Sequence, residues 1–155
     1  MKKMLLIAAA AVLLVGCNQA TPQPKVSVPS VQPTSEVTAP TEGAMVKPVT
    51  IDLDEQNKSG QKGTVEFKEE NGKTMVTIDL SGSVSAVPEP AHIHMGQCPN
   101  PGEVKYPLTN VVAGKSVTTL DMDLATLWKD ASNLAVNVHK SANELKSYVA
   151  CGDLM

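Results

Sequence analysis

Short runs in which apolar and polar residues alternate recur through roughly the last 110 residues of this 155-residue chain. They cover residues 49–53, 75–80 and 134–139, and turn sequences such as Asn71-Gly72 separate them. Alternation predicts half-buried β-strands, because successive side chains on a strand point to opposite faces. Strand-like runs about ten residues apart, with almost no helical period, predict an all-β fold: an antiparallel Greek-key β-sandwich or barrel of seven or eight strands.

The beginning of the chain predicts export. Lys2 and Lys3 precede an apolar run over residues 4–15, which is too short to cross a bilayer and is typical of a signal peptide. Residues 14–17, Leu-Val-Gly-Cys, resemble the bacterial lipobox, which implies cleavage before Cys17 and lipidation of that residue. The alternative is an ordinary signal peptide with an incidental cysteine. We therefore expect a lipoprotein of the cell envelope, outside the cytoplasm and held to a membrane through Cys17.

Residues 18–45 are rich in proline, serine and threonine and have neither a helical nor an alternating period. Such a segment cannot bury a core, so we predict a disordered tether. The folded domain is expected over residues 46–155. Within it, the three prolines between 99 and 107 predict a loop, residues 108–112 predict a strand, and residues 124–131 predict one short helical turn.

Two cysteines remain once Cys17 carries lipid. Disulfides persist outside the cytoplasm, so we expect Cys98 and Cys151 to be bonded, the alternative being two free buried thiols. The bond would close a loop of about 54 residues and contribute roughly 4 kcal/mol on the chain-entropy model.

The charge of the chain excludes one class of partner. After removal of Lys2 and Lys3, 11 lysines face 16 acidic residues, the net charge is −5, and arginine is absent. A nucleic-acid partner is therefore excluded. No residue identifies a protein partner, and we expect a monomer.

All three histidines lie on the polar faces of predicted strands. His92 and His94 share one face of a strand, whereas Met95 points to the other and is expected to pack in the core. His139 ends a second alternating run and provides a third imidazole. Three imidazoles with an open position suit Cu(II) and Zn(II) alike, so one metal ion is the interpretation that we favour. The alternative is that these histidines are solvated and bind nothing.

The order of these features resembles the Cu/Zn superoxide dismutase family. There, a His-x-His strand and a later Val-His provide copper ligands, and a closing Ala-Cys-Gly carries a disulfide cysteine. The matching residues here are His92-Ile93-His94, Val138-His139, Ala150-Cys151-Gly152, Cys98 in the loop after the first pair, and Gly63-Thr64-Val65-Glu66-Phe67. The resemblance implies a superoxide dismutase-like sandwich in which His92, His94 and His139 hold copper rather than zinc.

The chain also departs from that family. No histidine lies between His94 and His139, so the bridging and zinc ligands are missing and the site can hold only one ion. The guiding arginine is missing too, and a lysine lacks its planar fork. We therefore expect weak superoxide dismutation or none.

CHRD domains are a second resemblance, because they also pair a His-Ile-His strand with an Asn-Val-His strand, as at 137–139. Three functions follow from the two resemblances. The first is a membrane-anchored lipoprotein that sequesters or delivers one copper ion. The second is a mononuclear copper superoxide dismutase, and the third is a metal-free CHRD-like interaction module.

Overall fold

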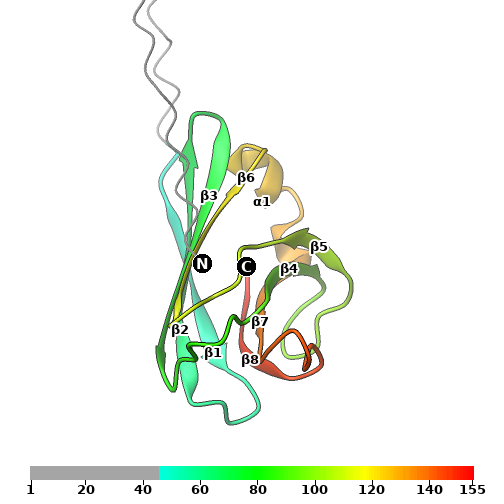
Figure 1. The fold of residues 1–155 in the computed structure, drawn as a ribbon. Helices are drawn as coiled ribbons and strands as arrows, with labels where there is room; N and C mark the ends of the chain where they lie inside the picture. The colour runs from blue at the N-terminus through cyan, green and yellow to red at the C-terminus, as the bar shows by residue number, and fades with distance from the viewer. Residues whose placement is uncertain (1–45) are drawn as a thin grey trace, which may run out of the picture. The chain divides into compact units, whose positions relative to one another are not determined.

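A computed structural model describes residues 46–155 as a protein built almost entirely of antiparallel strands (Figure 1). One helical turn, α1, follows the sixth strand, and a 3-10 turn, η1, leads into the seventh. The elements are β1 (Val49–Glu55), β2 (Gln61–Glu70), β3 (Lys73–Gly82), β4 (Ala91–Met95), β5 (Val104–Pro107), β6 (Lys115–Leu120), α1 (Leu124–Trp128), η1 (Ala131–Asn133), β7 (Leu134–His139) and β8 (Tyr148–Asp153).

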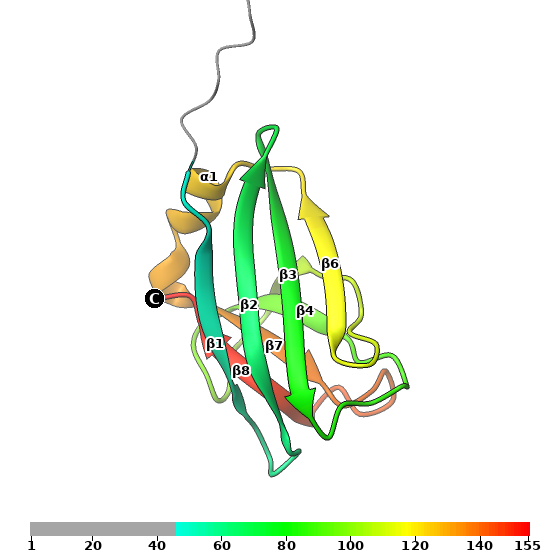
Figure 2. The ribbon, with the colours of Figure 1, turned by 90° about the vertical axis from the view of Figure 1, so that its left-hand side faces the viewer.

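The strands form one curled sheet in the order β5-β4-β7-β8-β1-β2-β3-β6. Its two halves face each other, with β1, β2, β3 and β6 in one layer and β4, β5, β7 and β8 in the other (Figures 1 and 2). The end of β1 joins them, because Asp54 and Glu55 pair with Cys151 and Ala150 of β8. The predicted all-β antiparallel fold of seven or eight strands is confirmed. Its Greek-key and superoxide dismutase-like details stay predictions.

The apolar residues predicted to share one face of each strand meet between the two layers. Phe67 is fully buried, and its ring contacts the edge of Trp128 with the centroids 5.2 Å apart. The Asp123 carboxylate caps α1 by accepting from the backbone N–H of Thr126 at 2.6 Å, which places Leu124 and Leu127 in the core. The predicted helical turn is therefore confirmed. Other core residues are Leu53, Val65, Val76, Ile78, Ile93, Leu134, Val136 and Val138.

The Asn71-Gly72 turn between β2 and β3 is also confirmed. Both residues have positive φ, 54° and 72°, which is the backbone that a tight two-residue hairpin requires. The resulting register runs without interruption from Gln61↔Gly82 to Glu70↔Lys73. This hairpin is the longest paired unit among the described strands and forms the centre of the first layer (Figure 2).

Three sequence predictions in this domain are wrong. Residues 104–107 are not loop but strand β5; this strand is at the edge of the sheet, where Pro107 is tolerated because a missing N–H breaks no ladder. Residues 108–112 make only the single bridges Glu89↔Val111 and Val112↔Lys115, because this segment crosses from one layer to the other. Met95 is 37% exposed instead of packed in the core, since β4 ends there and extends beyond the facing layer.

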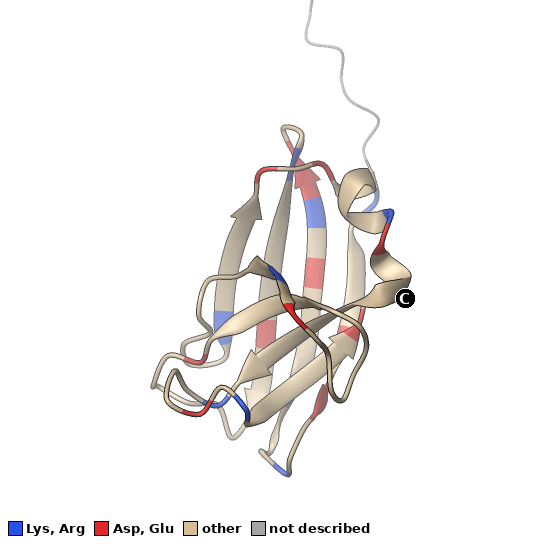
Figure 3. Ribbon diagram, turned by 90° about the vertical axis from the view of Figure 1, so that its right-hand side faces the viewer, with Lys and Arg blue, Asp and Glu red and all other residues tan. Residues whose placement is uncertain are grey.

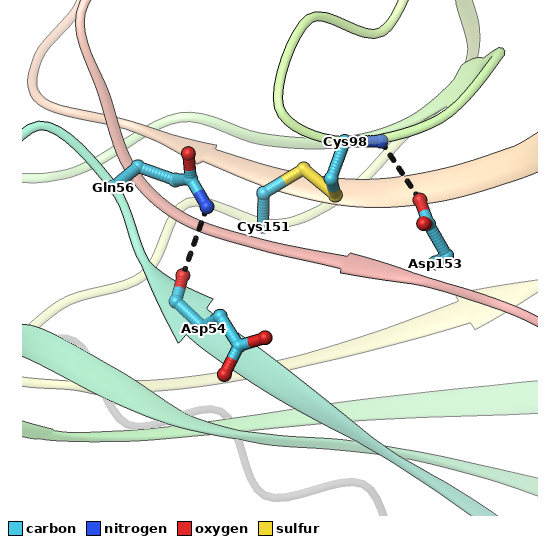
Figure 4. Close-up of a disulfide and its surroundings, with 5 residues drawn as sticks. All are labelled: Asp54, Gln56, Cys98, Cys151 and Asp153. Carbon is cyan, nitrogen blue, oxygen red and sulfur yellow. Dashed lines mark hydrogen bonds between the residues drawn. A yellow bond between two sulfur atoms is a disulfide. The ribbon is translucent and has the colours of Figure 1, made fainter.

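The disulfide between Cys98 and Cys151 is present, as predicted. It ties the loop after β4 to β8, and the backbone N–H of Cys98 also donates to the Asp153 carboxylate at 2.8 Å (Figure 4). The two attachments hold residues 96–103 against the outer face of the second layer.

The signal peptide, the lipidated Cys17 and the tether predicted over 18–45 lie outside the described residues. Within 46–155, none of the helical segments is long and apolar enough to span a membrane.

Candidate metal centre

Three histidines meet on the outer face of the second layer. β4 places His92 and His94 on that face two residues apart, and its pairing with β7 aligns His92 with Asn137 and His94 with Ala135. His139 lies at the end of β7, where its backbone N–H donates to the Pro90 carbonyl. Residues 45 positions apart in the chain thus converge, and one ligand nitrogen from each histidine lies within 4.8 Å of the other two. The predicted ligand set is brought together.

Backbone carbonyls fix the tautomers of two of these rings. Nδ1–H of His94 donates to the Gly102 carbonyl at 2.9 Å, and Nδ1–H of His139 donates to the Leu145 carbonyl at 2.6 Å. Each ring therefore presents an unprotonated Nε2 to the centre. Metal-binding histidines are commonly oriented in this way by a hydrogen bond from their other nitrogen.

Nδ1 of His92 is 3.0 Å from Nε2 of His139. Because Nε2 of His139 is an acceptor, the metal-free His92 carries its proton on Nδ1 and donates across this contact. This separation is shorter than the roughly 4 Å that two metal–imidazole bonds can span, so one ion could contact both nitrogens.

Two of the three histidines are buried, and His92 is half-buried. His94 and His139 are each only 4% exposed, and Nε2 of His94 has no hydrogen-bond partner. Burial, together with the smaller effects of the neighbouring His139 and His94, lowers the pKa of His92 from 6.5 to about 4. Burial also lowers the pKa of His139, with the hydrogen bond to Leu145 acting in the opposite direction. His94 and His139 are therefore not solvated surface residues, whereas His92 stays partly exposed.

Asn137 is a residue of this site that the sequence did not single out. It is fully buried, and neither its amide oxygen nor its amide nitrogen has a partner. In the sheet, Asn137 of β7 pairs directly with His92 of β4. It lies between Ala135, which pairs with His94, and His139. Side chains in directly opposed positions share a face, with Cβ atoms about 5 Å apart. Asn137 is therefore on the same face of the sheet as His92 and His139. In the sequence, the Asn-Val-His motif at 137–139 was the signal that could have identified it.

The strands that carry the histidines are uncharged. β4 and β7 contain no lysine or acidic residue, and Figure 3 shows charged residues mainly on loops and on the other layer. Among residues 46–155, the three histidines are the only group of metal-binding side chains found together, and no carboxylate joins them. Neutral imidazoles would not offset the charge of a divalent ion held here. The ion would therefore attract water or a small anion as a further ligand.

The pKa of His92 predicts how the stability of the metal-free protein depends on pH. The unfolded chain takes up a proton near pH 6.5, whereas folded His92 does so only near pH 4. Between these values the unfolded state binds more protons, so stability is full above pH 6.5 and falls as the pH drops toward 4. Urea unfolding in the presence of a chelator at several pH values measures this. His92→Gln should show a shallower decline, and an identical decline would contradict the assignment.

No protein-family model, curated protein or solved structure matches this chain. The resemblances to the superoxide dismutase and CHRD families therefore rest on the motifs quoted above. The geometry establishes that three buried histidines could hold a metal ion, and it leaves the identity of that metal open.

Proposed function

We propose that the protein binds one copper ion through His92, His94 and His139 and sequesters or delivers it. The observation that carries this proposal is the convergence of three imidazoles, two of which are buried and oriented by backbone carbonyls. The unpaired Nε2 of buried His94 supports it, because a buried nitrogen without a partner costs about 1–3 kcal/mol that a bound ion would offset.

Copper is favoured over zinc by two arguments. Divalent ions bind a given set of nitrogen ligands in an order that peaks at Cu(II). The motifs that match the superoxide dismutase family also correspond to its copper ligands. The neutral donor set offers no carboxylate to the harder ions Mg²⁺ and Ca²⁺, which prefer oxygen.

Titration of metal-free protein with Cu(II) and with Zn(II) tests the proposal. We expect one copper per chain, with Cu(II) tighter by at least about tenfold, and nitrogen hyperfine structure in the electron paramagnetic resonance spectrum. A stoichiometry well below one, or a spectrum without nitrogen ligands, would count against it. The metal-free CHRD-like module would be supported instead.

A mononuclear superoxide dismutase is the second candidate, because three ligands leave a position open. Turnover also requires attraction of an anion and a source of protons. This chain has no arginine and a net charge of −3. We therefore expect the copper-loaded protein to dismutate superoxide far more slowly than the diffusion limit. Rates near that limit, abolished by His139→Ala, would favour the enzyme.

Asn137 is a candidate member of the proposed site, because its buried amide has no partner and the residue pairs with His92 across β4 and β7. Replacement by leucine keeps the volume and removes both unpaired polar groups. We expect Asn137→Leu to stabilise the metal-free protein, because buried unpaired amides are costly, but to lower Cu(II) affinity by about tenfold. Chemical unfolding and Cu(II) titration measure the two effects. An unchanged affinity and copper spectrum would remove Asn137 from the site.

The proposed location is the cell envelope, with the domain held to a membrane by lipid on Cys17. Residues 14–17 and the preceding apolar run support this proposal. Cys17→Ala should release the protein into the soluble fraction on cell fractionation, and retention with membranes would contradict the lipobox interpretation.

A further inference from the structure

A cavity separate from the histidines opens at the end of the sandwich where Figure 1 shows the β1–β2 turn and the loops after β3 and β7. Its volume is about 500 Å³, within the range of small-molecule sites. Gln61 and Glu89 line it together with serines 59, 83 and 85, and Val87 and Val149 add apolar surface.

Glu89 and Gln61 are almost completely buried, at 1% and 4% exposure. The Gln61 amide N–H donates to Oε1 of Glu89 at 2.7 Å, which holds the two side chains together. The other carboxylate oxygen, Oε2 of Glu89, and the amide oxygen, Oε1 of Gln61, have no hydrogen-bond partner. Buried polar atoms are nearly always paired, so two unpaired oxygens on residues that line one cavity point to a donor that completes them.

No lysine of the cavity satisfies Glu89. Lys140 lines the same cavity, but its ammonium group donates to the Glu144 carboxylate at 2.9 Å. Burial raises the pKa of Glu89, with the hydrogen bond from Gln61 acting in the opposite direction. The carboxyl group is therefore a desolvated acid without a cationic partner, and a cation brought by a ligand would supply one.

We propose that this cavity binds a small primary ammonium compound with a short aliphatic chain. The ammonium group has three donors, which match Oε2 of Glu89, Oε1 of Gln61 and one serine hydroxyl. The aliphatic chain would lie against Val87 and Val149. A calcium ion fits less well, because it takes six to eight oxygen ligands, often from several carboxylates, and Glu144 is already paired.

Butylammonium is a suitable probe, and the whole protein is kept free of metal so that the result is independent of the copper proposal. Chemical shifts of backbone amides are followed by NMR at pH 7.5. We expect saturable shifts in residues 59–61 and 83–89 with a Kd of roughly 1–10 mM. Butanol and butyrate, which share the chain but lack the charged donor, should cause no saturable shift.

Glu89→Gln is the decisive variant, because it keeps the shape and the contact with Gln61 but removes the charge. We expect at least a tenfold loss of butylammonium affinity, whereas Glu103→Gln, at an exposed carboxylate outside the cavity, should bind as the natural protein does. The proposal is overturned if butylammonium gives no saturable shift, if Glu89→Gln binds equally well, or if butanol binds equally well. Saturation by calcium chloride without any amine binding would overturn the ammonium assignment.

Discussion

If the proposed copper site is right, we expect the replacement of His139 with alanine to lower the affinity of the protein for Cu(II) by more than about 100-fold. Loss of a residue that only orients a metal ligand typically lowers metal affinity about 10- to 100-fold, so loss of the ligand itself should lower it more. His94→Ala should have a similar effect, because each of these rings directs an unprotonated Nε2 to the centre. Competition against a chelator of known affinity measures the change.

Tyr148→Phe is the matched control for this experiment. The Tyr148 ring contacts the His139 ring, with the centroids 5.2 Å apart, but it is not among the ligands. Phenylalanine keeps that contact, so copper affinity should stay within about twofold of the natural protein. If His139→Ala bound copper normally while His92→Ala or His94→Ala did not, the ion would lie elsewhere and the three-histidine site would be wrong. Circular dichroism of each variant separates loss of ligand from loss of fold.

Removing the disulfide by the double change Cys98→Ser and Cys151→Ser lowers the free energy of unfolding by about 4 kcal/mol on the chain-entropy model. The bond spans 53 positions of sequence, and the unfolded chain gains the entropy of that loop when it is absent. Small domains are stable by only about 5–15 kcal/mol, so this is a large fraction of the total. Urea unfolding of both proteins without metal measures the difference.

The same variant should bind copper about tenfold more weakly. Residues 96–103 carry the Gly102 carbonyl that orients His94, and Cys98 anchors this loop to β8. In the metal-free urea experiment, reductant serves as the control, because it should lower the stability of the natural protein to that of the double variant and leave the variant unchanged. A loss of stability below about 1 kcal/mol would show that the unfolded chain is already compact, since the entropy model assumes an expanded one.

Local patterns in the sequence determined most of the strands. Alternation placed Leu53, Val76 and Ile78 on buried faces, because the side-chain period of a strand does not depend on its neighbours. Asn71-Gly72 determined a hairpin for an equally local reason, since only a few residues accept two successive positive φ angles. The ligand set was predictable too, because the chain has only three histidines.

Tertiary structure decided which faces are covered and which strands are neighbours. β7 is buried on both faces, because the loop tied down by Cys98 covers its outer side, and alternation cannot reveal that cover. Asn137 was therefore missed, although it is on the same face as His139. The strand at 104–107 was missed because Pro107 is acceptable only at an edge, and edge position depends on pairing with β4. The convergence of His92 with His139 likewise required the β4–β7 pairing, a long-range contact that no local pattern specifies.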